Sequence, residues 1–501
     1  MKQDRREFLK KTGCALSMTA MATQLRHFGM VSAMAQSVEQ ETAINVPSDY
    51  RALVCIFMSG GNDGNNTVIP NHNDATISNY GVYSTARNAQ GLAIPQASLA
   101  GTSITVPAMS NLTYALHPSL GIQTQNGTTI VNNGIHELWG LGKMAIVTNV
   151  GTLVAPMTRT QYLNGTVPKP FQLFSHSDQV SQYQGGRSDH QSFTGWGGRI
   201  SDLRNTPDNP SGLVPMITSI AGAQLFTNGQ TTLPLAIADA RTSLAAVLNP
   251  VGFNQTTASV ARRNAFNSLR SIDLSSDVVA AASHLTDSAI AANTALQSTQ
   301  EVTTAFPTTG IGYQLKQIAR LIKTRNSLGI NRQIFFCQLG GFDTHNDQIA
   351  TQASLLTQLG QAMRSFYEEM QTQGIGDKVT QFTMADFSRT FNPAGTGGIV
   401  GTDHAWGNHM FVLGGGITGS NFYGMPTSNG TPFPHLGFAT GDDTDSGSSA
   451  RGRWIPSTSI EQYAATLSRW FGLPDANLQT VFPKIGNFTN TNLGFMQPPA
   501  P

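Results

Sequence analysis

Charged side chains are scarce in this sequence. Asp, Glu, Lys and Arg make up 12 % of the 501 residues, and the formal net charge is +1, whereas soluble proteins usually contain about 25 % of these residues. A chain this close to neutral has no extended basic field, which excludes nucleic acid as a partner and argues against an anionic membrane surface. The few carboxylates, and the imidazoles, are therefore informative by their positions.

Cysteine and long apolar runs are also rare. The chain has 3 cysteines, and Cys55 and Cys337 each lie within a strand-like apolar run. We expect them to be buried thiols that behave as small apolar side chains, because that is commoner than a disulfide in such a setting. Past the N-terminal region no segment is long and apolar enough to span a bilayer, so we expect a soluble mature protein without a permanent membrane anchor.

The N-terminus carries the features of an export signal. Residues 4–10 read DRREFLK, in which Arg5 and Arg6 form the pair that the twin-arginine translocase recognises. A weakly apolar stretch follows, and then Ala33-Met34-Ala35, a small-x-small site for signal peptidase. We expect residues 1–35 to be a twin-arginine signal peptide, residues 36–50 to be a disordered lead-in, and the mature protein to be periplasmic or secreted. A cytosolic N-terminus that happens to contain Arg-Arg is the alternative.

The rest of the chain predicts an α/β domain over residues 51–495. Five runs that are apolar on both faces are typical of strands in a mostly parallel sheet, namely Arg51–Met58, Met144–Val150, Gln333–Leu339, Lys378–Met384 and His409–Leu413. Three segments have one apolar stripe at helical spacing or otherwise resemble a helix, namely Tyr313–Thr324, Ser354–Met370 and Glu461–Phe471. A less regular, partly helical insertion is expected at about residues 203–307.

Acidic residues and histidines gather just after the predicted strands, beside glycine. Asp63 follows the first strand, Asp343 and His345 follow the third, and Asp386 follows the fourth, while Asp403 and His404 precede the last. In an open parallel sheet these positions meet at one edge. Such a group would repel itself without a cation, which favours a divalent metal such as zinc, manganese, iron or calcium. Helix capping and satisfied surface residues are the simpler interpretation of each residue taken alone.

A nucleophile is harder to identify. Ser175 stands beside His176 some way past the second predicted strand, and Thr67 in the first loop is a competing hydroxyl. A serine can be activated by a metal, but Ser175 could equally be a cap or turn residue. Arg389, shortly after the fourth strand, suits a clamp on a tetrahedral oxyanion.

The ordered motifs resemble a known family. They read GGNDGNNTVIP, LHPSL, GWGGRISD, QLKQIARLI, GGFDTHNDQ, ADFSRTFN, GTDHAWGNHMFVLGGGI and GRWIP. The chain resembles the twin-arginine-exported bacterial proteins catalogued as domain of unknown function 1501. That family is similar in pattern to the alkaline phosphatase and sulfatase superfamily, which implies a three-layer α/β/α fold and a two-metal hydrolytic centre.

The resemblance also implies roles for individual residues. It assigns Asp63, Asp343, His345, Asp386 and His404 as metal ligands, with Asp403 or His409 as additional candidates. Phe387 stands where the superfamily has a histidine, and Phe174 stands where the family has an arginine before Ser175 and His176. These departures indicate either a retuned site or a decayed one.

Two functions follow from these observations. The first is an exported metal-dependent hydrolase of a phosphate or sulfate ester on a small molecule or glycan, with Ser175, His176 and Arg389 at the reacting group. The alternative is a non-catalytic periplasmic or secreted binding protein on the same fold with a degenerate metal site. A single-metal enzyme outside ester hydrolysis is a third interpretation.

Overall fold

The computed structural model describes residues 49–498, apart from gaps at 123, 126–127, 130–133, 248–255, 271–286, 288–289, 298–300, 397–398, 439–442 and 447–450. The predicted signal peptide, 1–35, and nearly all of the predicted lead-in, 36–50, lie outside the described residues. In the part of the chain that is described, no helix has the length and apolarity needed to cross a membrane.

A nine-stranded sheet, counted over the described residues, forms the centre of the molecule, with the order β15-β7-β14-β11-β1-β10-β8-β9 and β16 also paired to β7. Its strands are β1 (Arg51–Met58), β7 (Met144–Gly151), β8 (Ile217–Ser219), β9 (Leu235–Ala236), β10 (Arg332–Leu339), β11 (Val379–Ala385), β14 (Asn408–Gly414), β15 (Phe422–Tyr423) and β16 (Thr458–Ser459). Smaller pairings involve β2 (Val68–Pro70), β3 (Ser103–Val106), β4 (Leu112–Leu116), β5 (Thr124–Gln125), β6 (Thr128–Thr129), β12 (Ala394–Thr396) and β13 (Ile399–Gly401).

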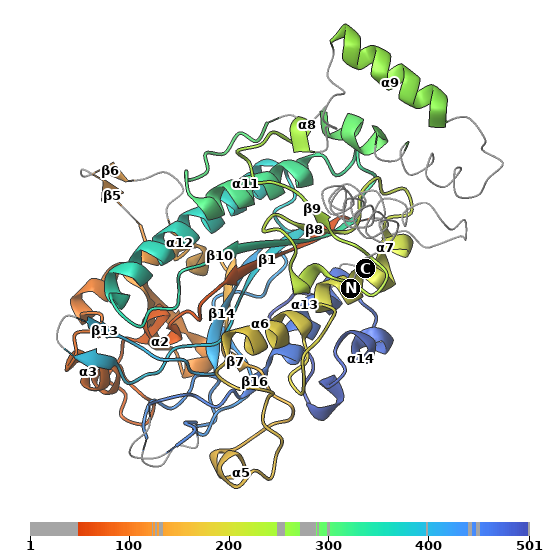
Figure 1. The fold of residues 1–501 in the computed structure, drawn as a ribbon. Helices are drawn as coiled ribbons and strands as arrows, with labels where there is room; N and C mark the ends of the chain where they lie inside the picture. The colour runs from red at the N-terminus through yellow and green to blue at the C-terminus, as the bar shows by residue number, and fades with distance from the viewer. Residues whose placement is uncertain are drawn as a thin grey trace, which may run out of the picture.

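Helices cover both faces of the sheet, which makes three layers (Figure 1). On one face lie α11 (Gly310–Lys323) and α12 (Gln348–Thr372), and on the other α6 (His176–Gly185), α7 (Trp196–Asp208) and α13 (Ile460–Phe471). Shorter helices are α2 (Gly64–Thr67), α3 (Tyr80–Asn88), α4 (Glu137–Gly140), α5 (Arg159–Asn164), α8 (Leu244–Val247) and α14 (Leu478–Val481), and α9 spans Thr257–Arg270.

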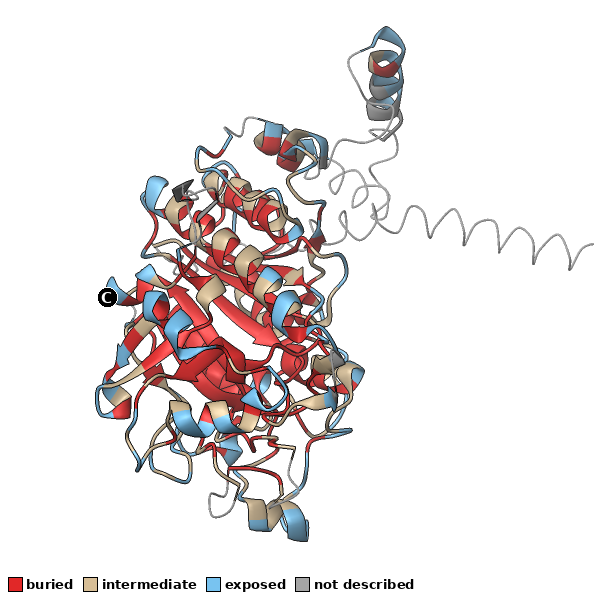
Figure 2. Cartoon of the chain, turned by 90° about the vertical axis from the view of Figure 1, so that its left-hand side faces the viewer, coloured by how far each residue is buried: buried red, intermediate tan, exposed pale blue. Residues whose placement is uncertain are grey.

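Consecutive residues of β11 show how the two faces are filled. The Gln381 side chain donates to the backbone oxygen of Met363 in α12, whereas the Phe382 ring packs against Trp196 of α7 and Tyr463 of α13. Successive strand residues point to opposite faces, so both faces of the strand are buried. Figure 2 shows the central strands buried along their length, as is typical of a sheet covered on both sides.

The predicted strands and helices are present, and the α/β class with a mostly parallel, helix-covered sheet is confirmed. Most ends shift by three residues or fewer, but the helix predicted at Ser354–Met370 begins six residues earlier, at Gln348. Cys55 and Cys337 are free and buried on neighbouring strands, as expected. Two features differ from the simplest prediction. Among the described strands of the sheet, β14 alone runs antiparallel to its neighbours. Within residues 203–307, β8 and β9 extend the central sheet in parallel, so this segment is partly built into the core.

The antiparallel direction of β14 decides which loops meet. Strands β1, β7, β10 and β11 all end at one edge of the sheet, and β14 begins at that edge because it runs the opposite way. The residues after β11 and before β14 pair with each other, with an isolated bridge between Arg389 and His404. The segment before β14 and the segments after β7, β10 and β11 therefore meet at this edge of the sheet.

Glu461, in the first turn of α13, is a buried carboxyl group. Neither side-chain oxygen has a hydrogen-bond partner of normal geometry among the described residues. Burial raises the pKa of this carboxyl to about 7, although the nearby hydroxyls of Ser459 and Ser188 lower it somewhat. The folded protein therefore holds this proton more tightly than the unfolded chain does, and the free energy of unfolding falls as pH rises from the ordinary carboxyl pKa to about 7.

We expect Glu461→Gln to remove this pH dependence. The amide is neutral at every pH, so the variant should melt roughly 2–4 °C above the parent at pH 8 and close to it at pH 5. Thermal denaturation at both pH values measures the effect. Glu137→Gln is the control, since Glu137 is partly exposed and pairs with Arg364, and surface ion pairs contribute little. Equal shifts of Glu461→Gln at both pH values would contradict this account.

Candidate metal centre

Three side chains meet at the edge where β7, β10 and β11 end. One ligand atom each of His176, Asp343 and His404 lies within 4.8 Å of the others. The Nε2 atoms of His176 and His404 are 3.1 Å apart, and they lie 3.4 Å and 3.3 Å from Asp343 Oδ1. His345 adjoins this group, because its Nε2 is 3.1 Å from Asp343 Oδ1 and 3.1 Å from His404 Nε2.

The four residues come from distant parts of the chain. His176 is the first residue of α6, which follows β7, and Asp343 and His345 lie in the loop between β10 and α12. His404 lies between β13 and β14. The loops are tied to one another by backbone bonds, including Thr402 N to Thr344 O at 3.1 Å. The sheet edge therefore positions the group, and no single motif contains it.

In each of these three histidines the other ring nitrogen, Nδ1, faces an oxygen atom. His176 Nδ1 is 2.6 Å from Asp386 Oδ2, His404 Nδ1 is 2.9 Å from the Phe174 carbonyl oxygen, and His345 Nδ1 is 3.3 Å from Asp403 Oδ1. An oxygen acceptor at Nδ1 assigns the proton of a neutral imidazole to that nitrogen.

The proton on Nδ1 leaves each Nε2 as a lone pair. These lone pairs face one another and the carboxylate oxygen of Asp343, to which Arg389 also donates, and a cation among the imidazoles would relieve the repulsion between their lone pairs. Histidine held by a carboxylate or carbonyl on its outer nitrogen is the usual arrangement of metal-bound imidazole. The donor set of two imidazoles and one carboxylate, His176, His404 and Asp343, fits a divalent metal such as zinc or manganese, with the His345 imidazole adjoining it.

The pKa values of the group follow from these neighbours. The hydrogen bond with Asp386 raises the pKa of His176 despite its partial burial, and burial lowers the pKa of His404. Burial alone would raise the pKa of Asp343, but the Arg389 guanidinium outweighs it and lowers that pKa. Asp343 is thus held as a carboxylate, ready to bind a cation.

Packing and backbone conformation hold the histidine rings in place. The buried Phe387 ring lies 4.7 Å, between centroids, from both His176 and His404. Phe174, whose carbonyl orients His404, has φ of 73°. A bulky residue in the left-handed region is strained, and such strain is concentrated at functional sites. Phe387, which departs from the superfamily pattern, therefore supports the histidines in this chain.

The structure places Asp63 in a separate environment. Its carboxylate is fully buried and forms an ion pair with Arg87, which is also fully buried. Asp63 also accepts hydrogen bonds from the Asn65 backbone N–H and the Gln348 side chain. Asp63 does not belong to the group of metal-ligating atoms, and a carboxylate with this many donors is already neutralised.

Arg389 lies against the metal group but is enclosed. Its side chain is 0 % exposed and Nη2 donates to Asp343, which itself is 46 % exposed. Nε and Nη1 are buried without a hydrogen-bond partner among the described residues. The expected clamp on a substrate oxyanion would need exposed donors, whereas this guanidinium is enclosed and donates to Asp343 Oδ1, the oxygen that the histidines also face.

The remaining predicted residues lie around the group in supporting or separate positions. Asp386 and Asp403 contact Nδ1 of His176 and His345, as described above. Ser175 Oγ donates to Asp178 at 2.6 Å and lies 3.2 Å from Ser177 Oγ, so its hydroxyl is engaged next to the centre. Thr67 Oγ1 donates to the Asp63 carbonyl oxygen at 2.7 Å.

His409, the other additional candidate, is buried in strand β14. Its ring stacks on Phe433, and burial lowers its pKa to about 3. It is a neutral side chain of the core and does not belong to the group of metal-ligating atoms.

Sequence reasoning missed three arginines near the site. Arg87 is the partner of Asp63, and nothing in its local sequence signals this. Arg451, which pairs with Asp403, and Arg453, which donates to the His404 carbonyl oxygen, flank the glycine of the GRWIP motif. The two arginines on either side of this glycine were the only sequence signal for these contacts.

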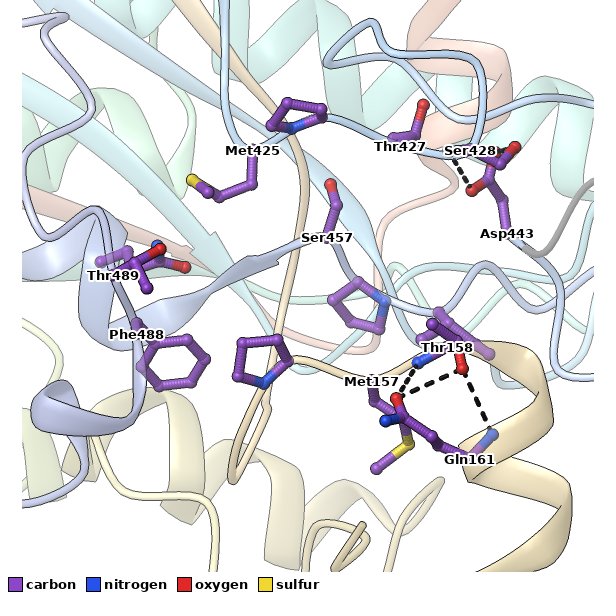
Figure 3. A pocket seen from close by; sticks show the side chains of 15 residues that line it. Met157, Thr158, Gln161, Met425, Thr427, Ser428, Asp443, Ser457, Phe488 and Thr489 are labelled. Carbon is purple, nitrogen blue, oxygen red and sulfur yellow. Dashed lines mark hydrogen bonds between the residues drawn. The ribbon is translucent and has the colours of Figure 1, made fainter. Parts of the chain in front are cut away.

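A pocket of about 520 Å³ lies elsewhere, lined by residues that include Met157, Met425, Ser457 and Phe488 (Figure 3). None of the predicted site residues lines it. Many of its polar groups already bond within the protein. The carboxylate of Asp443, for example, accepts from the backbone and hydroxyl of Ser428. This pocket and the candidate metal centre are therefore built from different residues.

Solved structures with similarity to this chain are distant. A sulfatase from Pseudoalteromonas sp., PsFucS1, shares 11 % identity and a TM-score of 0.26, over 74 % of this chain and 64 % of its own, which is less than two thirds. A mutant of TAB5 alkaline phosphatase with bound Mg shares 8 % identity and a TM-score of 0.23, over 73 % of this chain and 91 % of its own. A protein in the alkaline phosphatase superfamily from Vibrio parahaemolyticus shares 9 % identity and a TM-score of 0.23, over 77 % of this chain and 69 % of its own. Similarity at these TM-scores carries no argument about the site.

Sequence comparison places the chain more firmly. None of the curated proteins matches it. One family model matches residues 50–432, well over half of the chain. The chain belongs to the family described as Protein of unknown function (DUF1501).

Proposed function

We propose that this protein is an exported, metal-dependent hydrolase that acts on a phosphate or sulfate ester through a single divalent metal. The observation that carries the proposal is the meeting of three imidazole Nε2 atoms at one carboxylate oxygen, with each outer nitrogen facing an oxygen. His176, Asp343 and His404 would hold the metal. A divalent ion there would supply a Lewis acid and lower the pKa of nearby water.

One metal is proposed because the other carboxylates already have partners. Asp63 is neutralised by Arg87, and Asp386 contacts His176 Nδ1 and accepts from the Gly60 backbone N–H at 3.1 Å. Arg389 is attracted to Asp343, Asp63 and Asp403 together. Its fixed positive charge thus lies among the carboxylates that a second metal would require.

An anionic ester suits the charge of such a centre. The carboxylates of Asp343, Asp386 and Asp403 lie beside the guanidinium groups of Arg389 and Arg451. A divalent ion added to three carboxylates and two guanidiniums leaves a net positive charge, which attracts a phosphate or sulfate group. The histidine and Asp343 side chains are 26–46 % exposed, so a substrate can reach them.

His345 is the side chain best placed to move a proton. It has the largest exposed fraction of the three histidines, 44 %, against 33 % and 26 % for His176 and His404. Asp403 contacts its Nδ1, which resembles the acid–histidine pairs that act as general bases. With Ser175 bonded to Asp178, water rather than a serine would attack the ester.

A non-catalytic binding protein is the second candidate. The observation that favours it is the Ser175 hydroxyl, which donates to Asp178 and leaves the centre without an evident side-chain nucleophile. Such a protein would bind metal and anion but would not turn over any ester. The measurements below separate the two.

The first prediction concerns metal content. Mature protein purified after native export should carry about one divalent ion per chain, measured by mass spectrometry of the metals, and Asp343→Ala should lose it because the shared carboxylate oxygen is gone. His190→Ala is the control, since His190 is half exposed and pairs with Asp189 at 3.1 Å. Circular dichroism checks that each variant is folded. A metal-free parent protein, or two ions per chain, would contradict the single-metal proposal.

The second prediction separates metal binding from catalysis. His345→Ala should retain the metal yet lose 10²–10⁴-fold of ester hydrolysis, the usual contribution of a general acid or base. His404→Ala should lose both. Nitrophenyl phosphate and nitrophenyl sulfate provide the assay. Loss of metal from His345→Ala would place His345 among the ligands, and absence of turnover in the metal-loaded parent would favour the binding protein.

The third prediction concerns export. The double change Arg5→Lys and Arg6→Lys should leave the full-length precursor in the cytoplasm, because the translocase reads the arginine pair and lysine does not replace it well. Cell fractionation with immunoblotting measures the distribution. Arg26→Lys, later in the same segment, should be exported normally. Unchanged export of the double variant would remove the twin-arginine assignment.

A further inference from the structure

Two arginines, Arg451 and Arg453, flank the glycine of the GRWIP motif. Backbone bonds run from Asn392 N to Arg451 O at 3.0 Å and from Phe391 N to Gly452 O at 2.9 Å, so the segment is paired with the chain that follows β11. Gly452, between the two arginines, has a φ of 73°, so the contacts of each arginine, and not strand alternation, place its side chain. Trp454, the next residue along, points inward and packs on Phe391.

Both guanidinium groups reach residues that orient the histidines. Arg451 pairs with Asp403, whose other oxygen is 3.3 Å from His345 Nδ1. Arg453 Nε donates to the His404 carbonyl oxygen at 3.1 Å, and its guanidinium lies 4.3 Å from the centroid of Phe174. Phe174 in turn provides the carbonyl that orients His404. Two cations therefore lie beside the candidate metal centre.

These arginines are partly exposed, in contrast to Arg389. The side chains of Arg451 and Arg453 are 42 % and 30 % exposed, whereas that of Arg389 is 0 % exposed. Arg453 pairs with the buried Asp445 carboxylate, with Nη1 3.5 Å from Asp445 Oδ2. A guanidinium has five N–H donors, so Arg453 retains donors that a ligand can reach.

We propose that Arg453, with Arg451, binds the non-bridging oxygens of the substrate's phosphate or sulfate group beside the metal. A planar guanidinium fork matches two oxygens of a tetrahedral oxyanion. The stacking on Phe174 holds the fork in place, so little side-chain entropy is lost on binding. The inference rests on the proposed function, because it needs the metal centre, and it moves the oxyanion contact from Arg389 to two residues on another loop.

The test measures binding of inorganic anions to the metal-loaded protein. Calorimetry with phosphate and with sulfate is carried out on the parent, Arg451→Met, Arg453→Met, Arg453→Lys and the control Arg241→Met. Arg241 is 69 % exposed and pairs with Asp239. Metal content and melting temperature are measured for each protein, so that a disturbed metal centre is recognised.

We expect Arg453→Met to weaken anion binding about 10–100-fold at unchanged metal content, as for the loss of charge-assisted hydrogen bonds. Arg451→Met should weaken binding less, Arg453→Lys should restore part of the loss, and Arg241→Met should bind as the parent does. The anion that binds the parent more tightly indicates whether the ester is a phosphate or a sulfate.

The proposal is overturned if the metal-loaded parent binds neither anion, or if both methionine variants bind as the parent does. Loss of metal from Arg453→Met would show that this arginine only supports His404. Anion binding by Arg451→Met would then decide the proposal, and binding equal to that of the parent would overturn it. A parent protein without metal instead overturns the proposed function itself, which is a separate result from unchanged anion binding.

Discussion

The centre depends on the contacts made by the outer nitrogens of three histidines. Asp386, the Phe174 carbonyl and Asp403 each face one Nδ1, and this turns three Nε2 lone pairs toward Asp343. Without those oxygens the rings could exchange tautomers or rotate, and the group would be an ordinary cluster of histidines. Asp386 and Asp403, which the sequence predicts as ligands, instead contact the outer nitrogens of His176 and His345, as carboxylates beside metal-bound histidines often do. Phe387 adds rigidity by packing against two of the rings.

Scarcity of charge explains much of the surrounding chemistry. A buried charge is costly unless it is paired, and this chain places several of its few charges in buried or partly buried pairs at the sheet edge. Asp63 pairs with Arg87, and Asp343 pairs with Arg389. The Asp63–Arg87 pair neutralises a carboxylate that a second metal would need, which is consistent with the proposal of a single metal. Phe387, in the position of an expected histidine, is consistent with this arrangement.

The sheet controls the site through strand direction as much as through strand order. Because β14 runs against its neighbours, His404 can precede its strand and still reach the edge where Asp343 follows β10. The segment of Arg451 and Arg453 then pairs with the residues after β11 and places two partly exposed cations beside the centre. The proposed anion contacts and the candidate metal ligands therefore come from different loops that contact each other through Asp403 and His404.

The sequence by itself determined the elements of the fold and the residue types of the site. Apolar runs such as Arg51–Met58 appear as strands with the same bounds, because burial on both faces leaves a local pattern. Asp343, His345 and His404 were predicted together because they lie next to strand ends. Tertiary structure alone decided which side chains are donors and which are supports. The fully buried Arg87 next to Asp63, and the exposure of Arg453 against the burial of Arg389, depend on contacts between residues far apart in the chain. Local sequence carries no record of such contacts, since charge pairing and burial are set only when the loops meet.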